Sequence, residues 1–70
     1  MDNSEEIRAA LHKLGALFPT DGINIEVNYY FNCRENRRTF TVYVPSVGAV
    51  VGRNRLEDAV REIIKKGGKE

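Results

Sequence analysis

The side chains of this chain that could support nucleophilic chemistry are its single histidine, His12, and its single cysteine, Cys33. A cysteine nucleophile needs a base within hydrogen-bond reach and a third group that orients that base. No third group and no anion-stabilising loop accompany these two residues, which are far apart in the sequence. We therefore predict that the protein is not an enzyme, with His12 at the polar edge of a helix and Cys33 in a basic turn.

Metal and phosphate chemistry find equally little support. One histidine and one cysteine do not supply the ligand set of a zinc site. The segment from Gly48 to Gly52 and Arg53 lacks the lysine and hydroxyl of a phosphate-binding loop, so its glycines are interpreted as turn residues. We expect no metal and no cofactor.

Binding is the chemistry that the remaining polar and aromatic residues suggest. Tyr30 and Tyr43, with Asn28 and Thr41, combine aromatic rings with hydrogen-bonding groups, as the centres of protein interfaces do. The alternative is that the tyrosines are present for their β-propensity alone. We predict that these four residues contact a protein partner.

Charge is unevenly distributed along the chain. The net charge is +1, but residues 1–33 carry −3 and residues 34–70 carry +4. This asymmetry permits an anionic partner, and Arg37, Arg38, Arg53 and Arg55 are the candidate contacts to nucleic-acid phosphates. Proteins that bind nucleic acid mainly through phosphates usually have a larger basic excess, so a solvated mixed-charge surface is the competing interpretation.

Length and composition limit the class of protein. Seventy residues are expected to form one domain, residues 1–70, with a core too small for a deep active-site cleft. One cysteine excludes an intrachain disulfide, and a cytoplasmic location is expected. No apolar run reaches the roughly 20 residues of a membrane span, and the acidic start is unlike a signal peptide, so no contact with a membrane is predicted.

The first element is predicted to be a helix from Asn3 to Leu17. Asn3 and Glu6 have the spacing of a capping box, and Gly15 and Pro19 weaken and then end the helix. Apolar residues at three- and four-residue spacing form one face: Ile7, Ala10, Leu11, Leu14, Leu17 and Phe18.

Three strands are predicted to follow. Residues 23–32 alternate, and the apolar odd positions are expected to face the core: Ile23, Ile25, Val27, Tyr29 and Phe31. Residues 33–38 are expected to form a polar turn, and residues 39–44 the second strand of an antiparallel hairpin, with Phe40, Val42 and Val44 inward. Pro45 ends that strand. Residues 47–51 are predicted to be a short edge strand that could pair with a second copy, which would give a homodimer.

The last helix is expected to begin with a capping box of Asn54 and Glu57 and to end near Gly67. Its apolar stripe contains Leu56, Ala59, Val60, Ile63 and Ile64. The predicted fold class is therefore α+β, in the order α-β-β-β-α: a three-stranded antiparallel sheet with two helices packed on one face. The other face is expected to be open.

Residues 39–64 resemble the core of HicB-like antitoxins, in which a tyrosine-rich strand leads through a Val-Pro turn and a short strand to a Leu-Glu-Glu-Ala helix start. Val44-Pro45, Gly48 and Leu56-Glu57-Asp58-Ala59 match that pattern, and Ser46 stands where the family has an acid. The resemblance implies a non-enzymatic protein that binds and masks a partner such as a toxin ribonuclease.

In length and element order the chain also resembles a double-stranded-RNA-binding domain. The similar segments are Leu11-His12-Lys13-Leu14-Gly15 and Thr39-Phe40-Thr41-Val42. This resemblance implies binding of an RNA duplex through the four candidate arginines. Where that family has a Lys-Lys-x-Ala-Lys motif, this chain has the acids Glu57 and Asp58. We therefore take a protein partner as the main prediction and duplex RNA as the alternative.

Overall fold

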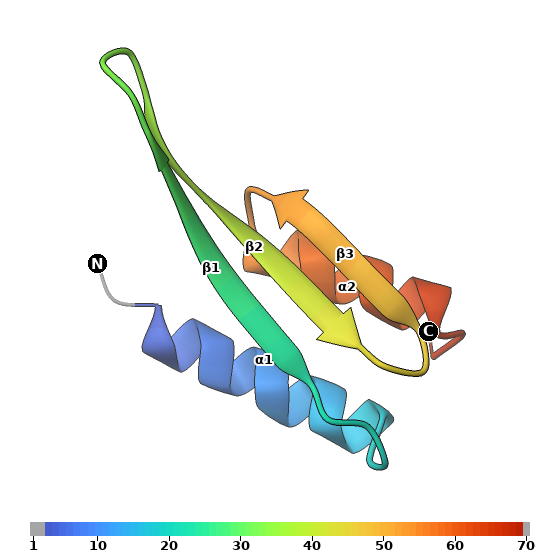
Figure 1. Cartoon of the computed structure of the whole chain (residues 1–70). Coiled ribbons are helices and arrows are strands. Elements are labelled where there is room, and N and C mark those ends of the chain that lie inside the picture. Colours follow the sequence, from blue (N-terminus) through green and yellow to red (C-terminus); the bar gives the residue numbers. More distant parts are fainter. Residues whose placement is uncertain (1–2, 70) are drawn as a thin grey trace.

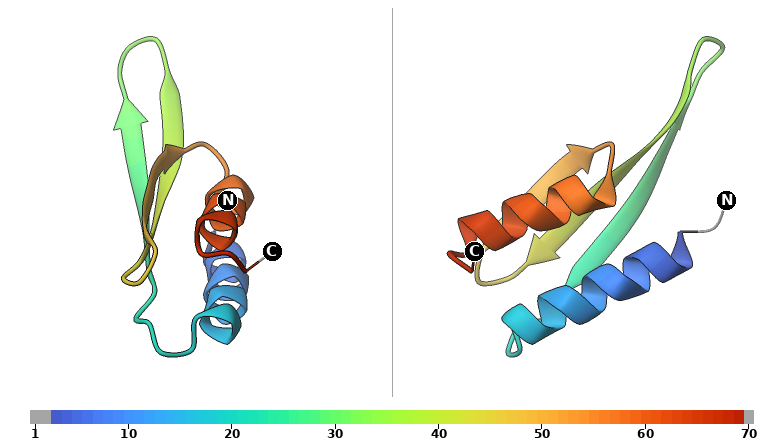
Figure 2. Two further views of the ribbon diagram at one scale, coloured as in Figure 1. Left: turned by 90° about the vertical axis from the view of Figure 1, so that its right-hand side faces the viewer. Right: turned by 180° about the vertical axis from the view of Figure 1, so that it is seen from behind.

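The computed structural model describes residues 3–69 as a helix, three strands and a second helix: α1 (Ser4–Leu17), β1 (Asn24–Phe31), β2 (Asn36–Val44), β3 (Gly48–Arg53) and α2 (Leu56–Lys66). The strands form one antiparallel sheet in the order β1-β2-β3. Both helices lie on one side of this sheet, and its other side is open (Figures 1 and 2). The predicted α+β class and element order are confirmed.

The core lies between the sheet and the helices. The second helix buries its whole predicted stripe, whereas α1 buries only Ala10 and Leu14, followed by Phe18 just beyond its end. These three residues are spaced four apart and form a narrow stripe. Leu11 lies beside that stripe and is exposed, so its predicted place on the buried face is wrong. The sheet contributes Phe40, Val42, Val44 and Val50.

Neither predicted capping box forms. Asn3 is the N-cap of α1, but its backbone (φ −99°, ψ 2°) is not extended, and its side chain makes no capping hydrogen bond. The N-cap of α2 is Arg55, one residue later than predicted, and it offers no side-chain acceptor to the helix N–H groups. The C-terminus agrees with expectation, because Gly67 is the C-cap of α2.

The β1–β2 hairpin is longer than predicted and extends past both helices (Figure 1). Residues 36–38 are not a turn; they belong to β2 and pair with residues 31, 30 and 29 of β1. At roughly 3.3 Å per residue, the nine residues of β2 span roughly 30 Å. The eleven residues of α2 span only about 17 Å. We call residues 29–38, which include the end of the hairpin, the arm.

The prediction that Tyr29 and Phe31 face the core is wrong, because both lie in the arm. Tyr29 and Phe31 lie on the same side of β1 as Ile25 and Val27, as the alternation predicts. They are nevertheless 72% and 78% exposed. The reason is that the sheet face continues into the arm beyond the reach of the helices that would cover it.

The loop at the end of the arm is held by one side chain. The Asn32 Oδ1 atom accepts hydrogen bonds from the backbone N–H groups of Arg34 and Glu35, both at 2.8 Å. The backbone N–H of Asn32 donates to the backbone carbonyl oxygen of Glu35 at 2.9 Å. An asparagine side chain that bonds to the backbone in this way stabilises a tight turn. The arm therefore ends in a defined four-residue loop, residues 32–35.

Candidate functional site

The open face of the sheet carries the four residues predicted to contact a protein partner. Tyr30 and Asn28 lie on β1, Thr41 and Tyr43 lie on β2, and all four point away from the helices. The Asn28 Nδ2 atom donates to Thr41 Oγ1 at 3.4 Å, which joins the two strands diagonally. The residues form a continuous line in the order Tyr30, Asn28, Thr41, Tyr43. We call this line the tyrosine stripe.

The stripe crosses most of the open face. Tyr43 is paired with Asn24, so the two tyrosines are six residues apart along the strands, or roughly 20 Å. Each tyrosine is 45% exposed, which leaves a large part of each ring available for contact. The structure thus places the four predicted residues on one surface, but with an aromatic ring at each end and not as a cluster of rings.

Neighbouring side chains hold the ring of Tyr30 in place. The guanidinium carbon of Arg37, the cross-strand partner of Tyr30, lies 4.8 Å from the ring centroid. Asn32 Nδ2 donates to the Tyr30 hydroxyl at 2.9 Å. Contacts that fix a side chain before binding reduce the entropy lost on association. Tyr30 is therefore oriented in advance of any partner.

The arginines predicted to contact phosphates do not form one surface. Arg37 and Arg38 are adjacent in β2, so their side chains point to opposite faces of the sheet. The Arg38 guanidinium lies on the helix side, 5.2 Å from the centroid of the Phe40 ring. Arg55 forms an ion pair with Glu57 at 3.0 Å.

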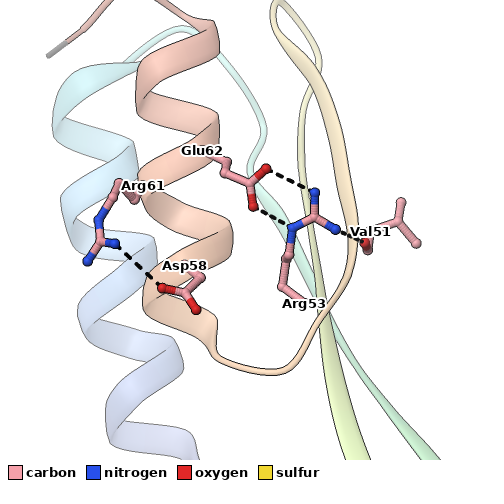
Figure 3. A network of polar contacts seen from close by, with 5 residues as sticks. All are labelled: Val51, Arg53, Asp58, Arg61 and Glu62. Carbon is pink, nitrogen blue, oxygen red and sulfur yellow. Dashed lines mark hydrogen bonds and ion pairs between the residues drawn. The ribbon is translucent and has the colours of Figure 1, made fainter.

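Arg53 is also paired with a carboxylate (Figure 3). Its Nε and Nη2 atoms both donate to the Glu62 carboxylate of α2, the latter at 2.9 Å, and its Nη1 atom donates to the carbonyl oxygen of Val51 at 3.1 Å. The hydrogen bonds between Arg53 and Glu62 hold the pKa of the Glu62 carboxyl below its ordinary value. The same bonds raise the pKa of the Arg53 guanidinium above its own ordinary value. The pair joins β3 to α2, so Arg53 has a structural role in this arrangement.

The residues considered for nucleophilic chemistry lie on different elements. His12 is an exposed residue of α1, and Cys33 is exposed in the loop at the end of the arm. Among residues 3–69, no three histidine, cysteine, aspartate or glutamate side chains gather where they could hold a metal ion. Neither helix of this part of the chain has the length and apolar character needed to cross a membrane.

The predicted edge strand is an edge, but its pairing with β2 contains one irregularity. β3 pairs only with β2, and its register shifts between the partners of Phe40 and Val42. Gly52 lies at the shift with φ +72°, a backbone conformation that favours glycine. A bulge of this kind interrupts the regular row of hydrogen-bonding groups that another strand would need. The Val51 carbonyl at this edge is already bonded to Arg53.

The exposed aromatic surface of the arm was not predicted from the sequence. Alternation assigned Tyr29 and Phe31 to the core, and a pattern of period two cannot tell a covered part of a sheet face from an uncovered one. The available signal was the group of arginines that follows, at positions 34, 37 and 38, because a strand end lined by cations is unsuited to burial.

In comparisons with known proteins, no protein-family model, no curated protein and no solved structure matches the chain.

Proposed function

We propose that this protein is a non-enzymatic binding module that contacts a protein partner through the open face of its sheet. The observation that carries the proposal is the tyrosine stripe, two half-exposed tyrosines joined by the hydrogen-bonded pair of Asn28 and Thr41. Tyrosine is enriched where binding energy is concentrated, because it offers a large contact area and a hydroxyl with few rotatable bonds.

The chemistry of the face fits a protein surface better than a polyanion. Among residues 3–69 its charged members are Glu26 and Arg37, which are opposite in sign, and Arg37 is placed over a tyrosine ring. The remaining exposed groups on the two longer strands are amides, hydroxyls and rings. Such a face can exchange hydrogen bonds with a partner without burying an excess of one charge.

The proposed class of partner comes from the resemblance to HicB-like antitoxins. It points to a small toxin ribonuclease, which the module would bind and mask. Duplex RNA receives less support as the ligand, because Arg53 and Arg55 are each paired with a glutamate and Arg37 and Arg38 point to opposite faces.

The test is co-expression of the protein with a candidate toxin ribonuclease, with growth of the host as the readout, and titration of the purified pair. The double variant Tyr30→Ser and Tyr43→Ser should no longer protect the host, and it should raise the dissociation constant by about 30-fold or more, since truncation of a hot-spot tyrosine costs about 2 kcal/mol. Tyr29→Ser is the matched control, because Tyr29 is exposed on the opposite face of β1.

Stability and mass in solution are measured on the same samples. The double variant should unfold at nearly the same urea concentration as the unmodified protein, because both tyrosines are already half exposed. Unchanged association accompanied by a large loss of stability would contradict the proposal. Equal losses of affinity for the control and the double variant would contradict it as well.

A further inference from the structure

The arm presents aromatic rings and arginines that the proposed function does not use. On the side opposite to the tyrosine stripe, Tyr29 and Phe31 are the two most exposed large hydrophobic residues of the described chain. Arg38 is the cross-strand partner of Tyr29, and Arg34 lies in the loop at the end of the arm. We call the surface formed by Tyr29, Phe31 and Arg38, together with the loop residue Arg34, the arm surface.

The arm concentrates positive charge that is not neutralised. It carries three arginines and one glutamate, although the whole chain has a net charge of only +1. Arg34, Arg37 and Arg38 form no ion pair with a carboxylate of residues 3–69, whereas Arg53, Arg55 and Arg61 each form one. Two of these arginines, Arg34 and Arg38, are therefore available to an external anion near the exposed rings, whereas Arg37 lies over Tyr30 on the opposite face.

Arg38 is held at the base of this surface. Its guanidinium packs over Phe40, a core residue, and its Nε atom is buried without a hydrogen-bond partner among the described residues. A phosphate oxygen that meets the accessible part of this guanidinium would accept a charge-assisted hydrogen bond, which is stronger than one between neutral groups. Because this packing already restricts the Arg38 side chain, less conformational entropy is lost when it binds an anion.

Charge decides which occupant suits the arm surface. A second copy placed arm to arm would bring two sets of unpaired arginines together, which is unfavourable because like charges repel. A polyanion is attracted instead. Exposed aromatic rings next to unpaired cations are the combination by which proteins bind single-stranded nucleic acid, since bases stack on the rings and phosphates meet the cations.

The spacing of the rings favours a single strand over a duplex. Tyr29 and Phe31 are two residues apart on one side of a strand, or roughly 7 Å. Neighbouring bases of a duplex are about 3.4 Å apart and cover one another, so they offer no free faces to two such rings. The bases of a single strand can separate and stack individually.

We propose that the arm surface binds single-stranded nucleic acid, with Tyr29 and Phe31 as stacking platforms and Arg34 and Arg38 as phosphate contacts. This binding is independent of the protein-binding proposal, because it uses the opposite side of β1. The end of the arm is suited to such binding, because Asn32 fixes the loop and the hairpin extends past both helices there (Figure 2). Tyr29 and Phe31 are accordingly exposed.

The experiment is a fluorescence-anisotropy titration of a labelled RNA of about 12 nucleotides with no self-complementarity. With two phosphate contacts, log K should fall with log salt with a slope of about −1.4, so tripling the salt from about 50 mM should weaken binding about fivefold. Tyr29→Ser and Phe31→Ser should each weaken binding about fivefold or more at low salt, since one base stack contributes about 1 to 3 kcal/mol.

Matched controls come from the other side of the same two strands. Tyr30→Ser removes a ring of the same kind as Tyr29→Ser, and Arg37→Gln removes the same charge as Arg38→Gln. The Tyr30→Ser variant should bind the RNA nearly as well as the unmodified protein. Arg38→Gln should reduce the salt slope by about 0.7, and Arg37→Gln should reduce it less.

Three results would overturn the proposal. The first is no binding of the single strand at about 50 mM salt. The second is unchanged binding by both Tyr29→Ser and Phe31→Ser, or equal losses for these variants and Tyr30→Ser. The third is a duplex of the same sequence bound at least as tightly, or polyglutamate displacing the RNA as well as unlabelled RNA does, because either would mean that stacking plays no part.

Discussion

Phe40 and Phe31 provide a test of how far the core extends along the hairpin. Both are phenylalanines on the helix side of the sheet, Phe40 on β2 and Phe31 at the end of β1. Phe40 is 1% exposed, whereas Phe31 is 78% exposed. The perturbation is the same in both cases, Phe40→Ala and Phe31→Ala, so only the surroundings of the ring differ.

The expected magnitudes follow from burial. Replacing a fully buried phenylalanine by alanine costs about 3 to 5 kcal/mol, because apolar contact is lost and a cavity remains. A domain of this length has a free energy of unfolding of about 4 to 10 kcal/mol. Phe40→Ala should therefore remove a large fraction of the stability. Phe31→Ala should change the stability by no more than about 0.5 kcal/mol.

The assay is urea unfolding followed by far-ultraviolet circular dichroism and by tyrosine fluorescence, which is usable because the chain contains no tryptophan. Agreement of the two probes would support a two-state transition and allow the free energies to be compared. Each variant is measured at two protein concentrations that differ about tenfold, since the stability of an associated species depends on concentration.

A loss of more than about 1 kcal/mol for Phe31→Ala would contradict an uncovered position for this ring, because an uncovered ring contributes little to folding. If that loss grew with protein concentration, the ring would be covered by a second copy, and the arm surface would not be free for nucleic acid. A loss below about 1 kcal/mol for Phe40→Ala would contradict the location of the core itself.

Two further predictions concern the helices. Gly67→Ala should destabilise the protein by about 1 to 3 kcal/mol, because the added Cβ would lie 2.7 Å from Cζ of the buried Phe18. At Gly15 the added Cβ has no atom within 4 Å apart from the adjoining residues and the backbone of α1, so Gly15→Ala should stabilise α1 by about 0.5 to 1 kcal/mol. A lowered thermal midpoint for Gly67→Ala and a raised one for Gly15→Ala would confirm the two predictions. The Arg53–Glu62 pair contributes to the free energy of unfolding at neutral pH. This contribution is lost as the pH falls below 4.5 and through the folded-state pKa of Glu62, which is lower. The stability difference between the unmodified protein and Glu62→Gln should therefore shrink between neutral pH and about pH 2, and a constant difference would contradict this role.

The element order could be read from the sequence because it depends on local periodicity. The stripe of α2 and the alternation in β1 and β2 each repeat over several residues, so one misplaced side chain does not obscure them. The same alternation placed the four residues of the tyrosine stripe on one face. Capping was less predictable, because a side chain that can accept a hydrogen bond does so only if the backbone points it at the helix N–H groups, and at Asn3 it does not.

Local patterns of residue types therefore predict the order of helices and strands and which residues share a face. The point at which the helices stop covering the sheet depends on tertiary packing: Val27 is partly buried, and Tyr29, two residues further along the same face, is exposed. The tertiary structure also decided that Arg53 meets Glu62 while Arg38 meets no carboxylate of the described residues. Both depend on the relative lengths and placement of elements distant in the sequence, and no local pattern of residue types carries that information.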